Sequence, residues 1–87
     1  MPRIEKTIIV KCRQGLHARP AAMFVQIANK YASAVTVRKG AEEVNGKSIM
    51  GILMLGADHG CELFMITDGD DAVQMFAELE AYLVKED

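Results

Sequence analysis

Residues 4–32, IEKTIIVKCRQGLHARPAAMFVQIANKYA, contain the pattern that decides the fold. Residues 4–11 are rich in β-branched side chains, which fit a pleated, half-buried surface, and they are followed by the turn-prone Gln14 and Gly15. This segment predicts a first strand that ends in a turn. Residues 18–32 then change to the spacing of a helix.

The helix should begin within a residue or two of His17, because Pro20 is tolerated only in the first turn. Its apolar side chains recur at three- and four-residue steps, as one face of a helix requires. These positions are Ala21, Val25, Ala28 and Ala32.

The next segment predicts a hairpin. Residues 34–39 alternate valine with Thr36 and Arg38, which is the period of a half-buried strand. Residues 40–43 then form a turn that leads into a short strand around Val44.

Residues 48–55 are almost wholly apolar, and periodicity alone does not separate a buried strand from a short helix. Ser48 as an N-cap and Gly56 as a C-terminal stop favour the helix. Residues 62–67 predict another strand, and residues 71–85 predict a last helix that begins with acidic residues. The apolar stripe of that helix comprises Ala72, Phe76, Leu79 and Leu83.

The element order is therefore βαββαβα. Four strands covered by helices on one side make a two-layer, open-faced α/β sandwich of the α+β type. A chain of 87 residues is too short to divide its core, so residues 1–87 are expected to form one domain.

Composition excludes several classes of function. A formal net charge of -2 gives no general attraction to nucleic acid or anionic lipid. The longest apolar run, residues 49–57, is interrupted by Gly51 and Gly56 and is far shorter than a membrane span. The amino terminus lacks the apolar stretch of a secretory signal, so we expect a cytoplasmic location and free, reduced Cys12 and Cys61.

Most catalytic apparatus is missing. The sequence has no glycine-rich loop for a nucleoside triphosphate, and a zinc site would require His17, His59, Cys12 and Cys61 to converge from scattered positions. We therefore expect no metal and no cofactor, and a surface position for His59.

One dense constellation remains, a histidine at a helix start with an arginine two residues later. At such an N-cap, the unpaired N–H groups of Ala18 and Arg19 suit an anion. A neutral nitrogen of His17 could attack phosphorus, and the Arg19 guanidinium could hold the phosphoryl oxygens. On the residues alone, a plain polar cap is the alternative.

The string Gly15-Leu16-His17-Ala18-Arg19-Pro20-Ala21 resembles the active-site signature of the HPr family, phosphocarriers of the bacterial phosphoenolpyruvate-dependent phosphotransferase system. The string from Val44 to Gly51 resembles the regulatory serine segment of that family. The resemblance implies an antiparallel sheet of strand order 1-4-2-3 with three helices on one face. It also implies that Enzyme I donates a phosphoryl group to His17, usually at Nδ1, with Arg19 stabilising it, and that enzyme IIA removes it.

The resemblance further implies that Ser48 is a regulatory phosphorylation site and that an HPr kinase/phosphorylase is a partner. Gln14 departs from the Ser, Asn or Thr that many relatives carry there. A nitrogen-branch or purely regulatory paralogue is the alternative within the family, although regulatory relatives that lack the histidine differ from this chain at His17. Outside the family, the further alternative is a small acid–base or metal enzyme that uses His17 and a cysteine.

The short helix at residues 49–55 cannot bury every side in a two-layer domain. We expect Ile49, Met50 and Leu53 to form a docking surface for Enzyme I and enzyme IIA, on a protein that acts as a monomer. Packing in the core is expected for the other methionines with core-like spacing, which are Met23, Met54, Met65 and Met75.

Overall fold

The computed structural model describes residues 2–86. Seven elements follow one another in the order that the sequence predicts: β1 (Arg3–Ile9), α1 (Ala18–Ala28), β2 (Ala34–Lys39), β3 (Glu42–Asn45), α2 (Ile49–Leu55), β4 (Glu62–Asp68) and α3 (Ala72–Leu83). Residues 49–55, for which periodicity alone did not separate a strand from a helix, thus form a helix.

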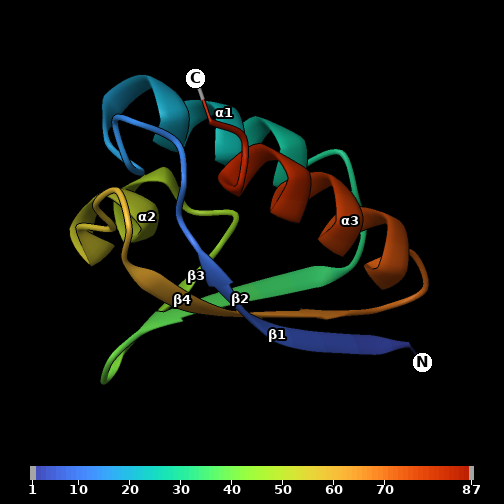
Figure 1. The fold of residues 1–87 in the computed structure, drawn as a ribbon. Helices are drawn as coiled ribbons and strands as arrows, with labels where there is room; N and C mark the ends of the chain where they lie inside the picture. The colour runs from blue at the N-terminus through green and yellow to red at the C-terminus, as the bar shows by residue number, and fades with distance from the viewer. Residues whose placement is uncertain (1, 87) are drawn as a thin grey trace.

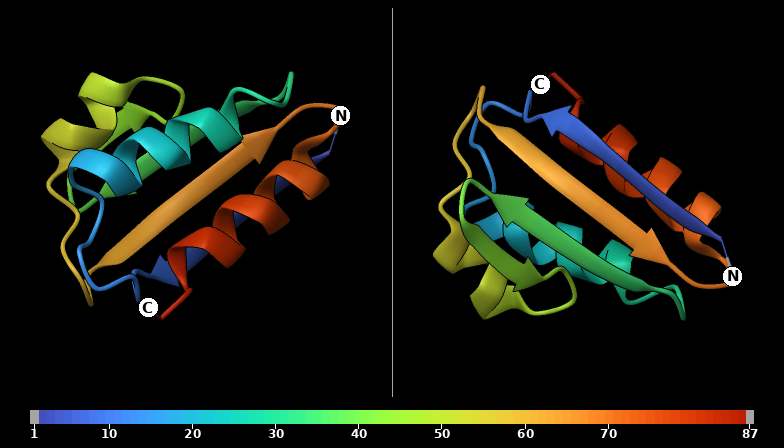
Figure 2. Two further views of the ribbon diagram at one scale, coloured as in Figure 1. Left: turned by 90° about the horizontal axis from the view of Figure 1, so that it is seen from above. Right: turned by 90° about the horizontal axis from the view of Figure 1, so that it is seen from below.

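The four strands form one antiparallel sheet in the order β1-β4-β2-β3. All three helices lie on one side of this sheet, and the opposite side is bare (Figures 1 and 2). The predicted two-layer α+β sandwich and its strand order are confirmed. Within residues 2–86, every helix is too short or too polar to span a bilayer.

The central strand β4 organises the core. Its alternate residues Leu63, Met65 and Thr67 are fully buried beneath the helices, as a period-two pattern requires. Met65 faces Val37 on β2, and Leu63 faces Ile8 on β1. The predicted stripe of the last helix is buried throughout, with Ala72, Phe76, Leu79 and Leu83 all at 4% exposure or less.

Two predicted methionine positions are wrong. Met23 on α1 and Met54 on α2 are 40% and 69% exposed, because they lie beside the core stripe of each helix rather than on it. The neighbouring Phe24 and Leu55 take the buried positions instead. Met65 and Met75 pack in the core as predicted.

The hairpin turn is shorter than the sequence predicts. Glu42 and Glu43 belong to β3, where they face Lys39 and Arg38 across the strand pair. Opposite charges at facing positions stabilise such a pair, so the strand extends to the acidic residues. Only residues 40–41 remain as the turn.

The first helix ends at Ala28 rather than at the predicted Ala32. It ends there because the backbone of Ala32 and Ser33 is hydrogen-bonded to another part of the chain. Their backbone N–H groups donate to the carboxylate of Asp71, at 3.0 and 2.9 Å, and the Ser33 hydroxyl donates to the same group. Asp71 is the N-cap residue of α3. One carboxylate therefore ties the α1–β2 connection to the start of α3.

These hydrogen bonds, that of the Ser33 side chain first, hold the pKa of Asp71 below its ordinary value of 3.8. The ionised group therefore contributes stability that is fully present above pH 3.8 and is lost as the pH falls through the lower folded value.

We expect Asp71→Asn to lower Tm at pH 7 by weakening this junction. The deficit relative to the parent should shrink as the pH falls below 3.8, because the parent loses the same ionised group there. Thermal melts across pH 2 to 7 measure this, with the exposed neighbour variant Asp70→Asn as the control. A deficit that stays constant down to the lowest pH would contradict the role given to the carboxylate.

Candidate functional site

His17 lies at the junction between the β1–α1 loop and the first helix. It is the N-cap residue of α1, in extended conformation with φ -111° and ψ 163°, and its side chain does not cap the helix. The side chain is 48% exposed. The first N–H groups of the helix, on Ala18 and Arg19, have no acceptor within the helix because no turn precedes them.

The backbone around His17 is strained. Ala18 has φ +31°, the only positive value among the non-glycine residues that the structure describes. A non-glycine residue in this region costs about 1–3 kcal/mol, so surrounding contacts must hold it there.

Those contacts come from a second loop, between α2 and β4. The N–H of Leu16 donates to the Ala57 carbonyl at 2.7 Å, and the N–H of Gly60 donates to the Val10 carbonyl at the same distance. The Leu16 side chain is fully buried in the core, and burying a leucine is worth about 1.5–3 kcal/mol. The residue before His17 therefore anchors the loop.

Gly15 permits this close approach of two loops. It has φ +65°, and a Cβ placed there would lie 2.5 Å from the Ala57 carbonyl oxygen and 2.9 Å from Cα of Asp58. Both obstacles are backbone atoms, which cannot move aside as a flexible side chain can. The Cys12 thiol adds a contact of 3.5 Å to the Gly15 carbonyl oxygen.

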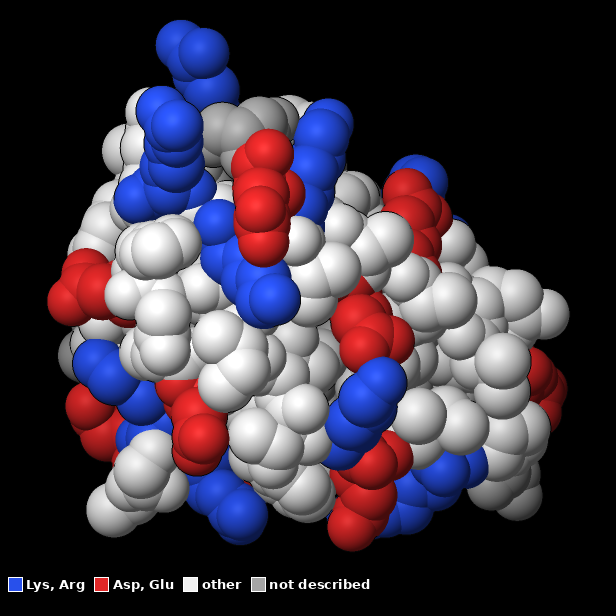
Figure 3. Space-filling view, viewed as in Figure 1, with Lys and Arg blue, Asp and Glu red and all other residues white. Residues whose placement is uncertain are grey.

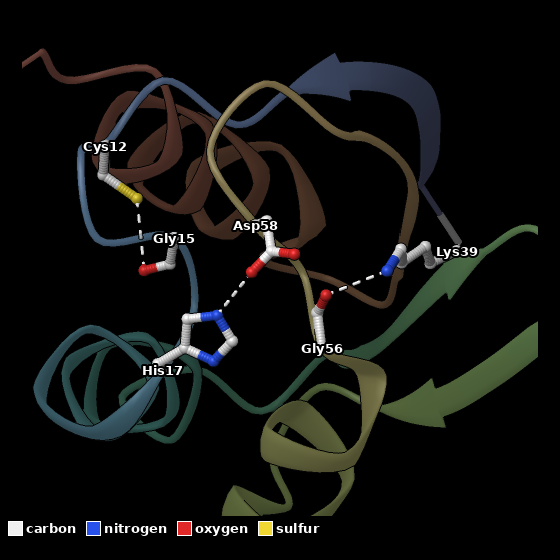
Figure 4. A network of polar contacts seen from close by, with 6 residues as sticks. All are labelled: Cys12, Gly15, His17, Lys39, Gly56 and Asp58. Atoms are coloured by element: carbon white, nitrogen blue, oxygen red, sulfur yellow. Dashed lines mark hydrogen bonds and ion pairs between the residues drawn. The ribbon is translucent and has the colours of Figure 1, made fainter.

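The docked loops bring a carboxylate to the histidine. Nε2 of His17 lies 2.7 Å from Oδ1 of Asp58, while the other ring nitrogen, Nδ1, points away from Asp58 (Figure 4). This hydrogen bond is the largest cause that lowers the pKa of Asp58. The sequence analysis missed Asp58 because it lies 41 positions from His17 in the chain. The one available signal was its position beside His59 in a short loop.

Arg19 lines an open cleft of about 460 Å³. Basic side chains gather at this end of the molecule, over the start of α1 and the C-terminal segment (Figure 3). The lining residues are Cys12, Arg13, Gln14, Arg19, Pro20, Met23, Tyr82 and Lys85. Gln14, at which the sequence departs from the resemblance noted above, thus lines the cleft.

The second predicted segment also lies at this end of the molecule, where α2 and the start of α1 are neighbours (Figures 1 and 2). The Ser48 hydroxyl accepts from the Gly51 N–H at 3.1 Å, so the predicted N-cap is confirmed. Gly56 ends the helix in left-handed conformation, as predicted. Ile49, Met50 and Leu53 are 38%, 63% and 38% exposed, so none of them belongs to the core.

The remaining candidates do not form a second centre. Neither Cys12 nor Cys61 forms a disulfide, and His59 is exposed. No group of three or more potential ligands within residues 2–86 could hold a metal ion.

The chain is similar to known proteins along almost its whole length. The family model that describes the phosphorylation site of the PTS HPr component matches residues 4–85. The HPr-like protein Crh of Halalkalibacterium halodurans is 42% identical over 83 residues, which cover 95% of this chain and 99% of that protein.

Solved structures agree with this match. The crystal structure of the phosphocarrier protein HPr from Bacillus anthracis superposes with a TM-score of 0.91 at 40% identity, covering 93% of this chain and 96% of that one. The crystal structure of Bacillus subtilis Crh, described as a dimer with a swapping domain, has a TM-score of 0.75 at 40% identity and covers 92% of each chain.

We expect Gly15→Ala to reduce the free energy of unfolding by about 3 kcal/mol, since it adds both a collision and an unfavourable φ. Gly40→Ala is the matched control: its φ is +59°, but a Cβ there meets nothing within 4 Å. It should cost only about 1 kcal/mol. Urea unfolding of both variants measures the difference, and equal losses would contradict the close approach of the two loops.

Proposed function

The chain belongs to the HPr family of the phosphotransferase system, and we propose that it accepts a phosphoryl group from Enzyme I on His17 and passes it to enzyme IIA. The observation that carries this proposal is the orientation and exposure of the His17 ring. One nitrogen is bound to Asp58, the other is directed away from it, and the side chain is about half exposed. A nucleophile that must meet two large partners in turn needs this accessibility.

The chemistry requires little of the protein besides position and charge. The lone pair of Nδ1 would form the new N–P bond as the bond from phosphorus to the donor atom breaks and its electron pair leaves with the donor. Arg19 would offer its planar guanidinium to the phosphoryl oxygens, and the first N–H groups of α1 would add hydrogen bonds. Transfer to enzyme IIA reverses the same step on a different acceptor.

The exposed face of α2 is the proposed docking surface. Ile49, Met50 and Leu53 present apolar side chains to solvent at the same end of the molecule as the start of α1. Contiguous apolar residues on a soluble protein are typical of partner sites. Because His17 would accept the phosphoryl group from Enzyme I and then donate it to enzyme IIA, both partners would use this surface in turn.

Ser48 is the proposed regulatory site, with an HPr kinase/phosphorylase as its partner. It lies directly before Ile49, so a phosphate on its hydroxyl would add nearly two negative charges at the margin of the docking surface. The free N–H groups at the start of α2 favour an anion, so the helix should persist. Regulation would then act by charge and desolvation at the interface rather than by unfolding.

A regulatory or nitrogen-branch paralogue is the second candidate. Its support is the similarity to the HPr-like protein Crh, which matches at 42% identity. Phosphoryl acceptance from Enzyme I separates the carrier from a purely regulatory paralogue, because only a carrier gains an acid-labile phosphoryl group.

The proposed working form is a cytoplasmic monomer. The swapped dimer described for Bacillus subtilis Crh is the alternative assembly. Sedimentation velocity at cellular concentration decides between them.

We expect His17→Ala to gain no acid-labile phosphoryl group when it is incubated with Enzyme I and phosphoenolpyruvate, while its melting curve stays close to that of the parent. Arg19→Lys should accept more slowly, by about tenfold, since it keeps the charge but loses the two-pronged contact. Labelled phosphate on the chain measures both, with His59→Ala as the control. Normal acceptance by His17→Ala would refute the proposed function.

A negative charge on the docking surface should impair transfer without unfolding the protein. We expect Ser48→Asp and Met50→Asp each to slow acceptance from Enzyme I by about tenfold or more, with Tm nearly unchanged. Ser48→Ala should accept normally and resist an HPr kinase. Rates equal to the parent for both aspartate variants would show that this surface takes no part in docking. Loss of fold in Met50→Asp would show that this substitution acts on stability rather than on docking.

A further inference from the structure

We propose that Asp58 is a positioning residue for phosphoryl transfer: its carboxylate accepts the Nε2–H of His17 and so fixes the ring with the Nδ1 lone pair free for phosphorus. This inference rests on the proposed function of His17 and adds a second residue to it. The geometry that carries it is the 2.7 Å contact between Nε2 and Oδ1, across 41 positions of the chain.

The contact decides which ring nitrogen holds the proton. An ionised carboxylate has acceptors only, so a short contact to it requires a hydrogen on Nε2. In the neutral ring the lone pair is then on Nδ1, the nitrogen that points away from Asp58 (Figure 4). The pKa of Asp58 is lowered first by this same hydrogen bond, which favours the ionised form.

Asp58 is itself held from two sides. The carbonyl of the preceding residue, Ala57, accepts the Leu16 N–H at 2.7 Å, and the Asp58 carbonyl accepts the Cys61 N–H at 3.1 Å. The Lys39 ammonium donates to the Gly56 carbonyl at 2.8 Å, which ties β2 to the end of α2. The backbone that carries the carboxylate is therefore fixed against the loop that carries His17.

Orientation outweighs charge in this arrangement. The side chain of Asp58 is 75% exposed, so water screens its attraction to the positive charge that the ring gains when the N–P bond forms. The hydrogen bond selects one tautomer and one ring orientation before transfer, so this effect does not depend on the attraction between the two charges. During transfer the Nδ1 lone pair forms the bond to phosphorus, the donor atom leaves with its electron pair, and the Nε2 proton stays in place.

The carboxylate also avoids the incoming phosphoryl group. Nε2 and Nδ1 lie on different sides of the imidazole, so Asp58 holds the ring from the side opposite to attack.

The test compares three variants of the full chain. Asp58→Ala removes the acceptor, Asp58→Asn keeps an acceptor oxygen without the charge, and Asp70→Ala removes an exposed carboxylate beyond the opposite end of β4. Two readouts are taken: the rate of acceptance from Enzyme I and phosphoenolpyruvate, and the ¹⁵N NMR shifts of the His17 ring at about pH 9, where imidazole is neutral.

We expect Asp58→Ala to accept about tenfold more slowly and to show the Nδ1–H tautomer that the parent lacks. Asp58→Asn should restore the parent tautomer and a rate within about threefold, and Asp70→Ala should match the parent in both readouts. This pattern supports the positioning role.

Several results overturn it. An unchanged rate in Asp58→Ala would show that Asp58 does not affect transfer. A slower rate with an unchanged tautomer would show that Asp58 acts through docking of the partner and not through the ring. Failure of Asp58→Asn to restore the rate would exclude the hydrogen bond as the cause. If the parent itself gains no phosphohistidine, the proposed function falls, whereas a normal parent beside a normal Asp58→Ala removes only the role of Asp58.

Discussion

The close approach of two loops is the constraint on which the rest of this site depends. Gly15 lies so near the backbone of Ala57 and Asp58 that no side chain fits between them, and Leu16 bonds across the same gap. Burial of Leu16 holds the loop down. Because His17 follows directly, its place on the surface is set by a neighbour in the core, which lets an exposed side chain have a defined position.

The sheet supplies the frame for this approach. β4 lies between β1 and β2, so the loops that precede α1 and follow α2 leave the sheet at the same end. Val10 and Cys61 continue the pairing of β1 with β4 beyond the strands, with a hydrogen bond of 2.9 Å. The two loops are therefore already adjacent when they reach the site. At the opposite end of the sheet, the carboxylate of Asp71 ties the α1–β2 connection to the start of α3.

Charge is divided around His17 in a way that suits a transient phosphoryl group. The carboxylate of Asp58 contacts the ring at Nε2, while Arg19 lines a cleft together with other basic side chains. Ala18, the residue with the strained φ, lies between His17 and Arg19 in the sequence. Local strain at a functional site persists where the surrounding structure holds it, and here the docked loop and the first turn of α1 do so.

The sequence by itself determined the elements, because each depends on neighbours within a few positions. Ser48 and Gly56 mark the two ends of α2 through a cap and a left-handed residue, and the stripe of α3 follows from helical spacing. The place of His17 at a helix start follows in the same way from Pro20. These signals are local, so they can be read without knowing what packs against them.

Tertiary structure decided whatever depends on contact between distant segments. The end of α1 depends on Asp71, the length of β3 depends on charges across a strand pair, and the exposure of Met54 depends on which side of α2 meets the sheet. Asp58 is the clearest case. Its partner lies 41 residues away, and no spacing rule in a single sequence joins two loops that meet only after the sheet has formed.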